Sequence, residues 1–227
     1  MQTGTERIAG KARQNSKLVF TSLAHHLRDD LLLANLKCIP IKSGIGVDKM
    51  SVEEARNTFK EWSQEVVCQV HRGSYKPAPV RRVLIPKPGQ NGMRPIGVPT
   101  IIDRCLQKSV SDILSAIFEQ DFLPHSFGGR PNLGAHHAIS QLQRSISFTQ
   151  CNFVFEADIK SFFTSLDHGW VLKFVKQRVG DPRILRLIKK WLKAGAIHNG
   201  KFEESLQGTP QGGSISVLIS NIYLHYV

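Results

Sequence analysis

The stretch that decides the fold of this chain is FVFEADIKSFF, residues Phe153 to Phe163. It begins with apolar residues that favour a β-strand, and that run ends in an aspartate, Asp158. A carboxylate at the end of a buried strand has lost most of its water and needs a cation or hydrogen-bond donors nearby. The stretch therefore predicts a buried strand that ends in a metal-ligand candidate. A turn cap or a lysine partner is the alternative role for Asp158.

The composition favours a folded protein that binds nucleic acid. The chain has 227 residues, of which 41% are hydrophobic, and this is enough to bury a core. Thirty lysines and arginines against eighteen aspartates and glutamates give a net charge of +12. Such a surplus attracts a polyanion through phosphate neutralisation and counterion release. A basic surface kept only for solubility is the alternative explanation.

Neither a disulfide framework nor a zinc site is indicated, because the four cysteines lie far apart without a C-x-x-C pair. No apolar run approaches the roughly 20 residues that span a bilayer, and the N-terminus lacks the apolar core of a signal peptide. We therefore expect no membrane partner. The expected compartment is a reduced one, either the cytoplasm or an organellar matrix.

The first 150 residues are predicted to form an arm and a helical region around one hairpin. Residues 1–17 are polar and basic without a sustained apolar period, so we expect a flexible arm. Residues 18–150 carry helical periods, with a capping box at Ser51 and a cap at Thr100. A hairpin is predicted at about residues 80–98. The hairpin carries four cations, Arg81, Arg82, Lys87 and Arg94. They suit contacts with phosphates. The alternative is that they only keep the hairpin soluble.

Two glycine-rich segments are also candidates for ligand contacts. The loop SFGGRPNLG, residues 126–134, carries Arg130 among glycines that let a backbone approach closely. The turn from Gly208 to Gly213 precedes an apolar helix that we expect to begin near Ser214. Backbone N–H groups at such a helix start can face a phosphate, and Gln211 offers both a donor and an acceptor. Glycine turns before helices are common, so this signal is weak alone.

Several of these segments, in their present order, resemble one known family. FVFEADIKSFF, the GTPQGG turn with NIYLHYV, the IPKPGQNGMRPIGVP hairpin and the SFGGRPNLGAHHAI loop are similar to the finger and palm regions of a group II intron-encoded reverse transcriptase, or maturase. FTSLAHHL and GIGVDKMSVEEA resemble its opening blocks, and the likeness runs from about Phe20 to Val227. It implies RNA-directed DNA polymerisation and splicing assistance, with an intron RNA template, a DNA primer and deoxynucleoside triphosphates.

The resemblance also implies roles for individual residues in nucleotide chemistry. Asp158 matches the first palm carboxylate, and the Ile159 backbone carbonyl matches a second ligand to catalytic Mg²⁺, or to Mn²⁺ in its place. Phe163 matches the aromatic residue that crowds the sugar 2′ position and so favours deoxynucleotides. Lys87 and Arg94 match the finger cations that hold the incoming triphosphate.

Other positions are expected to meet template and RNA. Gln211 and Gly212 match the turn that lies beside the nucleotide and the template. Arg81 and Arg82 are predicted to bind RNA on the strength of the local and overall charge. Arg130 is predicted to contact nucleic acid from its glycine-rich loop, in which Gly129 stands where relatives carry an aromatic residue.

The family's second carboxylate pair lies in a Tyr-x-Asp-Asp turn downstream of the helix after the glycine turn, and this sequence reaches Val227 without it. One carboxylate does not hold two Mg²⁺ ions, since each ion prefers octahedral oxygen coordination and the pair shares ligands. We therefore expect that the 227-residue chain alone does not polymerise DNA. A non-catalytic, maturase-like RNA-binding module is the alternative function, and a retron or diversity-generating reverse transcriptase is the alternative within the polymerase class.

The predicted fold class is α/β (α+β), with the finger and palm regions of a right-hand polymerase. Residues 18–150 would form the finger region, and residues 151–227 an incomplete palm whose small antiparallel sheet carries Asp158. An incomplete sheet leaves an unpaired edge, which favours self-association. A homodimer is therefore a further expectation.

Overall fold

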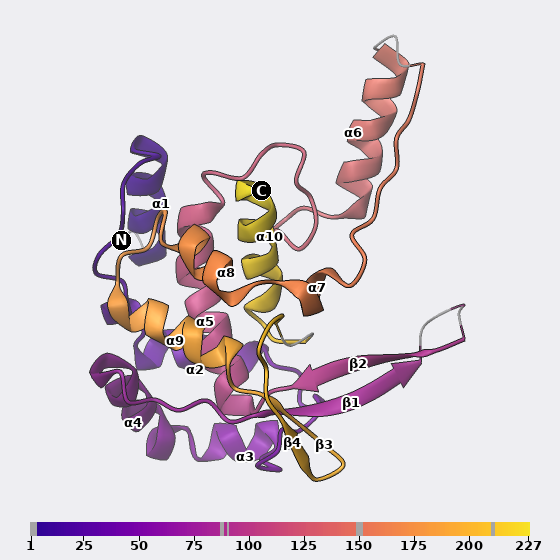
Figure 1. The fold of residues 1–227 in the computed structure, drawn as a ribbon. Coiled ribbons are helices and arrows are strands. Elements are labelled where there is room, and N and C mark those ends of the chain that lie inside the picture. Colours follow the sequence, from indigo (N-terminus) through magenta and orange to yellow (C-terminus); the bar gives the residue numbers. More distant parts are fainter. Residues whose placement is uncertain (1–3, 87–88, 90, 149–151, 210–211) are drawn as a thin grey trace.

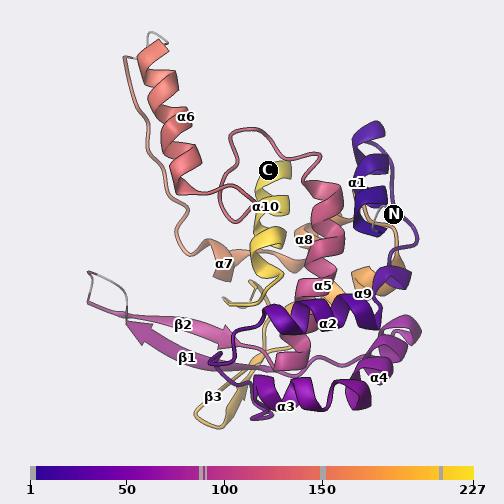
Figure 2. The same cartoon turned by 180° about the vertical axis from the view of Figure 1, so that it is seen from behind.

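A computed structural model of the chain describes residues 4–86, 89, 91–148, 152–209 and 212–227. A helical body carries a hairpin and one outlying helix, which both project from the same side (Figures 1 and 2). The helices are α1 Gly4–Gln14, the 3-10 helix Ala24–His26, α2 Asp29–Cys38, α3 Val52–Asn57, α4 Phe59–Arg72, α5 Ile101–Phe118, α6 Ala135–Phe148, α7 Phe162–Ser165, α8 His168–Val175, α9 Pro182–Leu192 and α10 Ser216–Tyr226. The strands are β1 Val80–Pro86, β2 Met93–Val98, β3 Ala196–His198 and β4 Lys201–Glu203.

The four strands form one sheet in the order β2-β1-β3-β4. β1 and β2 are antiparallel and form the predicted hairpin, with Arg81 opposite Val98 and Ile85 opposite Arg94. β3 pairs parallel with β1, and β4 pairs antiparallel with β3. The mixed α/β class is thereby confirmed. The sheet itself differs from the prediction, because it is mixed and is built on the hairpin.

The segment before Asp158 is not the buried strand that its composition predicts. Residues 152–159 belong to no strand, and the side chains of Phe153 and Phe155 are 94% and 91% exposed. A strand forms only where a neighbour satisfies its backbone N–H and C=O groups, and no described strand lies beside this segment. Asp158 is therefore exposed, and the sheet that was expected to carry it is absent from the described residues.

Helix α5 is the centre of the core, because it carries buried residues on nearly all of its faces. Helices α1, α2 and α10 pack against it. In its first turn, the buried carboxylate of Asp103 accepts hydrogen bonds from Tyr75 Oη at 2.9 Å, Ala78 N at 3.1 Å and Trp191 Nε1 at 3.0 Å. Burial raises the pKa of Asp103, and these donors oppose that rise. The strand β1 thus begins from a segment attached to both α5 and α9.

The helix caps predicted at Ser51 and Thr100 are confirmed, and Asp167 and Asp181 cap two further helices. Side-chain oxygens of Ser51, Thr100, Asp167 and Asp181 each accept a hydrogen bond from a first-turn backbone N–H. Gly73 ends α4 with a φ of 72°. The helix expected after Ser51 is divided, since α3 ends at Asn57 and α4 begins at Phe59.

The expected flexible arm is instead a packed helix, α1. Its residues Ile8 and Ala12 are 4% and 1% exposed, and α1 packs on α5. The side chain of Arg178, itself 2% exposed, donates to carbonyl oxygens at and beyond the end of α1 and forms an ion pair with Asp121. This cationic cap on a helix C-terminus comes from more than 150 residues away. Local sequence therefore did not reveal the helix.

We expect Asp181 to govern acid stability. Burial alone would raise the pKa of Asp181, but backbone N–H groups of Ala24, Leu23 and Arg183 and the Arg183 side chain lower it to about 2. Because the folded-state pKa lies below the unfolded value of about 3.9, the carboxylate stabilises the fold above about pH 4 and loses this effect as the pH falls towards about 2. Asp181→Asn should reduce the free energy of unfolding by about 2 kcal/mol at neutral pH.

Urea unfolding of both proteins between pH 2 and pH 7 measures this difference. The gap between them should shrink as the pH falls through the stated window. Glu53→Gln, an exposed acid-to-amide change in α3, is the control and should stay within about 0.5 kcal/mol of the parent. A gap for Asp181→Asn that is constant from pH 7 to pH 2 would contradict the prediction.

Candidate functional site

A hollow of about 780 Å³ lies where the segment before α7, strand β2, the glycine turn and α10 meet. Five residues predicted from the sequence line it, namely Arg94, Asp158, Ile159, Phe163 and Gly212. They come from three segments that are far apart in the sequence. The structure therefore assembles into one cavity what the sequence offered as separate motifs.

The glycine turn is held on one side by the segment around α7. The backbone N–H of Gly208 donates to Leu166 O at 2.7 Å, and that of Thr209 donates to Phe163 O at 2.8 Å. Gly208 has a φ of 81°, and a Cβ there would lie 2.8 Å from Phe163 O and from Thr164 Cα. Glycine is therefore required at this position by both conformation and space. A ring nitrogen of His168 also lies 2.7 Å from Gly208 O.

On its other side, the same turn touches strand β2. Gly212 has a φ of 109°, and a Cβ on it would lie 2.7 Å from Gly97 O and 2.9 Å from Ile96 Cγ2. Arg94 and Ile96 are two residues apart in β2, so they face the same side of the hairpin. The close approach of Gly212 to β2 thereby brings the exposed Arg94 to the hollow that contains Asp158.

The chain turns sharply between Asp158 and Phe163 at a residue that the sequence did not single out. Ser161 precedes α7 with φ 56° and ψ 29°, a left-handed conformation that costs a non-glycine residue about 1 kcal/mol. Its carbonyl accepts the N–H groups of Thr164 and Ser165 at 3.0 and 3.2 Å. This turn ends the extended segment and directs both Asp158 and Phe163 to the hollow.

Helix α10 supplies the remaining wall of the hollow through Val217 and Leu224, which sequence reasoning also missed. They are seven residues apart, so they share one helix face, and both side chains stay exposed although they are apolar. That spacing was a signal that could have found them. Two predicted residues, Lys87 and Gln211, lie outside the described residues, and their roles stay predictions.

Arg81 and Arg82 do not form a single cluster, because adjacent strand residues point to opposite faces. Arg81 donates to Ile45 O from Nε at 2.9 Å and from Nη2 at 2.8 Å, and so holds the loop before α3 against the hairpin. Arg82 forms an ion pair with Glu203 in β4. Both guanidinium groups thus have partners within the protein, and their predicted RNA contacts stay untested.

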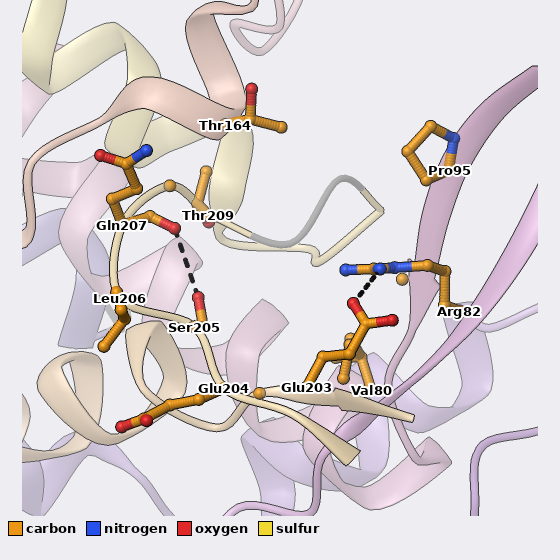
Figure 3. A pocket seen from close by; sticks show the side chains of 14 residues that line it. Val80, Arg82, Pro95, Thr164, Glu203, Glu204, Ser205, Leu206, Gln207 and Thr209 are labelled. Atoms are coloured by element: carbon orange, nitrogen blue, oxygen red, sulfur yellow. Dashed lines mark hydrogen bonds and ion pairs between the residues drawn. The ribbon is translucent and has the colours of Figure 1, made fainter. Parts of the chain in front are cut away.

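Arg82 faces a second, smaller hollow of about 340 Å³ on the other face of the hairpin. Figure 3 shows Arg82 and Glu203 joined at one end and Gln207 and Thr209 at the other, where Ser205 Oγ donates to Gln207 O at 3.4 Å. The charges of Arg82 and Glu203 offset each other there. This hollow therefore lacks the unpaired cation that an anionic ligand would need.

Arg130 supports the loop between α5 and α6. Its guanidinium pairs with Glu119 at 2.9 Å, donates to the carbonyl oxygens of Leu123 and Ser126, and lies 5.2 Å from the centre of the Phe122 ring. The side chain is only 10% exposed, so it is engaged within the fold, and the predicted nucleic-acid contact stays untested.

Packing against α10 explains why position 129, next to Arg130, is a glycine. Its φ is 66°, and a Cβ there would overlap the side chain of Val217. The adjacent Gly128 carbonyl accepts a hydrogen bond from Asn221 of α10 at 2.9 Å. An aromatic side chain at position 129 would therefore force this loop away from the helix.

Comparison with known proteins identifies the site's family. The family model described as reverse transcriptase (RNA-dependent DNA polymerase) matches residues 85–227, the part of the chain that contains the hollow. The chain belongs to the reverse transcriptase family. Members of this family bind a nucleic-acid template and use divalent metal ions for nucleotidyl transfer. The hollow therefore lies within a reverse transcriptase region.

The curated relatives point to group II introns. The chain is 34% identical over 221 residues to the group II intron-encoded protein LtrA of Lactococcus lactis subsp. cremoris, a match that covers 97% of this chain and 37% of LtrA. It is 40% identical over 194 residues to protein YkfC of Escherichia coli K12, covering 81% of this chain and 50% of YkfC. The chain thus spans between about a third and a half of the length of these two relatives.

A solved structure supports the fold. The partial Cas6-RT-Cas1–Cas2 complex contains a chain that matches 90% of this one with a TM-score of 0.58 and 22% sequence identity, over 34% of its own length. At that identity the likeness concerns the reverse transcriptase fold alone. Within the described residues, no helix has the length and apolarity to cross a lipid bilayer.

Gly208→Ala tests whether the turn's contact with α7 holds the reverse transcriptase site together. The added methyl group would meet backbone atoms on a left-handed residue, so we expect a loss of about 1–3 kcal/mol in the free energy of unfolding. Gly10→Ala is the matched control, because Gly10 lies in α1 with open space around it and alanine favours a helix. It should gain up to about 1 kcal/mol. Equal unfolding curves for the two variants would contradict this view.

Proposed function

We propose that the 780 Å³ hollow is the deoxynucleotide site of an RNA-directed DNA polymerase encoded by a group II intron. The chain would contribute finger and palm regions to that protein, with intron RNA as template and partner in splicing and with DNA as primer. The observation that carries the proposal is the meeting of three separate motifs around one cavity: Asp158 and Phe163 from the first, Arg94 from the hairpin and Gly212 from the glycine turn. The relationship to LtrA supports the intron origin.

Each of these residues suits one part of a deoxynucleoside triphosphate. Arg94 is exposed and forms no ion pair with a described residue, so its guanidinium can bind phosphate oxygens in pairs. Phe163 offers a partly buried ring, and its backbone carbonyl accepts a hydrogen bond from Thr209 N at 2.8 Å. We assign this ring to the sugar, where its bulk disfavours a 2′-hydroxyl group. Gly212 leaves the wall of the hollow open for the base and template.

The described residues do not by themselves fit the divalent ions of the transfer step. Asp158 offers one carboxylate and Ile159 a backbone carbonyl. No group of three or more His, Cys, Asp or Glu side chains among the described residues could hold a metal ion. Two Mg²⁺ or Mn²⁺ ions need more oxygen ligands than this pair supplies. These residues therefore account for nucleotide binding, and we propose that the 227-residue chain does not catalyse transfer alone.

Nucleotide binding should depend on Arg94. Arg94→Gln removes the charge that faces the triphosphate, and the loss of a charge-assisted contact of about 1.5–3 kcal/mol should weaken binding about ten- to a hundredfold. Equilibrium dialysis with a labelled deoxynucleoside triphosphate measures the dissociation constant. Arg144→Gln in α6, also an exposed arginine, is the control and should bind like the parent. Equal affinity of all three proteins would overturn the assignment of the hollow.

Primer extension and deoxynucleotide binding together separate the polymerase from a non-catalytic RNA-binding module, which the +12 net charge favours as the second candidate. The 227-residue chain, supplied with primed RNA, deoxynucleotides and Mg²⁺ or Mn²⁺, should give no extension product. Extension that disappears in Asp158→Ala would contradict this expectation and would eliminate the binding-only function. If the chain neither extends a primer nor binds deoxynucleotides but does bind RNA, the second candidate is favoured.

A further inference from the structure

A basic surface lies on the side of the molecule away from the hollow. Five exposed cations form this surface, which we call the α4–α9 basic face. They lie at the end of α4, in the segment that follows it, in α9 and at the residue directly after α9, and they are Arg72, Lys76, Arg186, Lys189 and Lys193. Both ribbon views show α4 and α9 at the side opposite the free end of the β1–β2 hairpin and α6 (Figures 1 and 2). A ligand in the hollow would therefore leave this face free.

The cations of this face form no ion pairs within the described structure, although Arg72 lines one hollow with Asp29 and Asp30. None of its five residues forms an ion pair with a described residue. Helix α9 contains no acidic residue, and its apolar residues are buried against the core. Arg186, Lys189 and Lys193 follow one another at spacings of three and four residues, so they form a stripe about 10 Å long on the outer face of α9. Clustered cations repel one another, and a polyanion relieves that repulsion.

The face is also held in a fixed shape. Lys190, in the middle of the stripe, donates to Gly73 O at 2.9 Å and to Tyr75 O at 2.6 Å, and so joins α9 to the end of α4. Gly73 is left-handed, and a Cβ there would overlap the guanidinium of Arg186. The missing side chain therefore lets Arg186 lie over the end of α4. The cations from both helices are thus placed side by side before any ligand arrives.

We propose that the α4–α9 basic face binds the phosphate backbone of a structured RNA, separately from the nucleotide hollow. The inference rests on the proposed function for its choice of RNA as the polyanion. A rigid, exposed stripe of lysine and arginine without aromatic side chains among its cations fits phosphates and has no means of reading bases. The α4–α9 basic face holds the RNA in place while the hollow binds the nucleotide.

The test compares two double variants of the full chain with the same change in charge. Lys189→Gln/Lys193→Gln removes two lysines from the α4–α9 basic face, and Lys37→Gln/Lys60→Gln removes two exposed lysines from α2 and α4 outside it. The probe is an RNA hairpin of arbitrary sequence, and its dissociation constant is measured over a range of salt concentrations. A lysine that neutralises one phosphate contributes about one unit to the slope of log affinity against log salt.

We expect the face variant to bind about tenfold more weakly at about 0.1 M salt, with a slope reduced by about one to two, and the control to bind like the parent. All variants should keep their deoxynucleotide affinity, because the face lies outside the hollow. Equal RNA binding by both variants would overturn the proposal, as would preferential binding of the face to anionic phospholipid vesicles. A failure of the proposed function would be distinguishable, because deoxynucleotide binding would then be absent from the parent too.

Discussion

The fold depends on the buried carboxylate of Asp103, which joins three segments: the start of α5, the residues that lead into β1, and α9. It accepts hydrogen bonds from Tyr75, from the backbone of Ala78 and from Trp191 of α9. Burial raises the pKa of Asp103, and the hydrogen bonds from these donors oppose that rise. Loss of this carboxylate would leave the buried donors of Tyr75 and Trp191 unpaired, at about 1–3 kcal/mol each, together with the partly buried N–H of Ala78. The start of the hairpin is therefore fixed relative to α5 and α9.

The hairpin is held at a second point by the glycine turn. Gly208 lies against α7 and Gly212 lies against β2, each at a distance that permits no side chain. The two contacts connect the segment that carries Asp158 with the strand that carries Arg94. A short glycine-rich turn thus determines the width of the hollow, and its glycines serve close packing as well as any contact with a nucleotide.

The cations of the chain divide into structural and exposed groups according to their surroundings. Arg130 and Arg178 are buried and bind carbonyl oxygens and carboxylates, and Arg81 holds a loop. Arg94 and the α4–α9 basic face remain exposed and without ion pairs among the described residues. Net charge alone does not distinguish these groups. An arginine far from any acid in the sequence can meet one in the fold, as Arg178 meets Asp121.

Sequence by itself determined the local features, because each depends on residues a few positions apart. These features are the helix caps at Ser51 and Thr100, the hairpin, the mixed class and the family motifs. The prediction of a strand before Asp158 was wrong, since a strand requires a neighbouring strand and the composition of a segment does not provide one. The prediction of a flexible arm was wrong because Arg178, which is distant in the chain, caps the C-terminus of α1. Only the tertiary structure decided which candidates share a cavity and which cations are already bound. Those outcomes depend on contacts between distant segments, and local patterns carry no record of them.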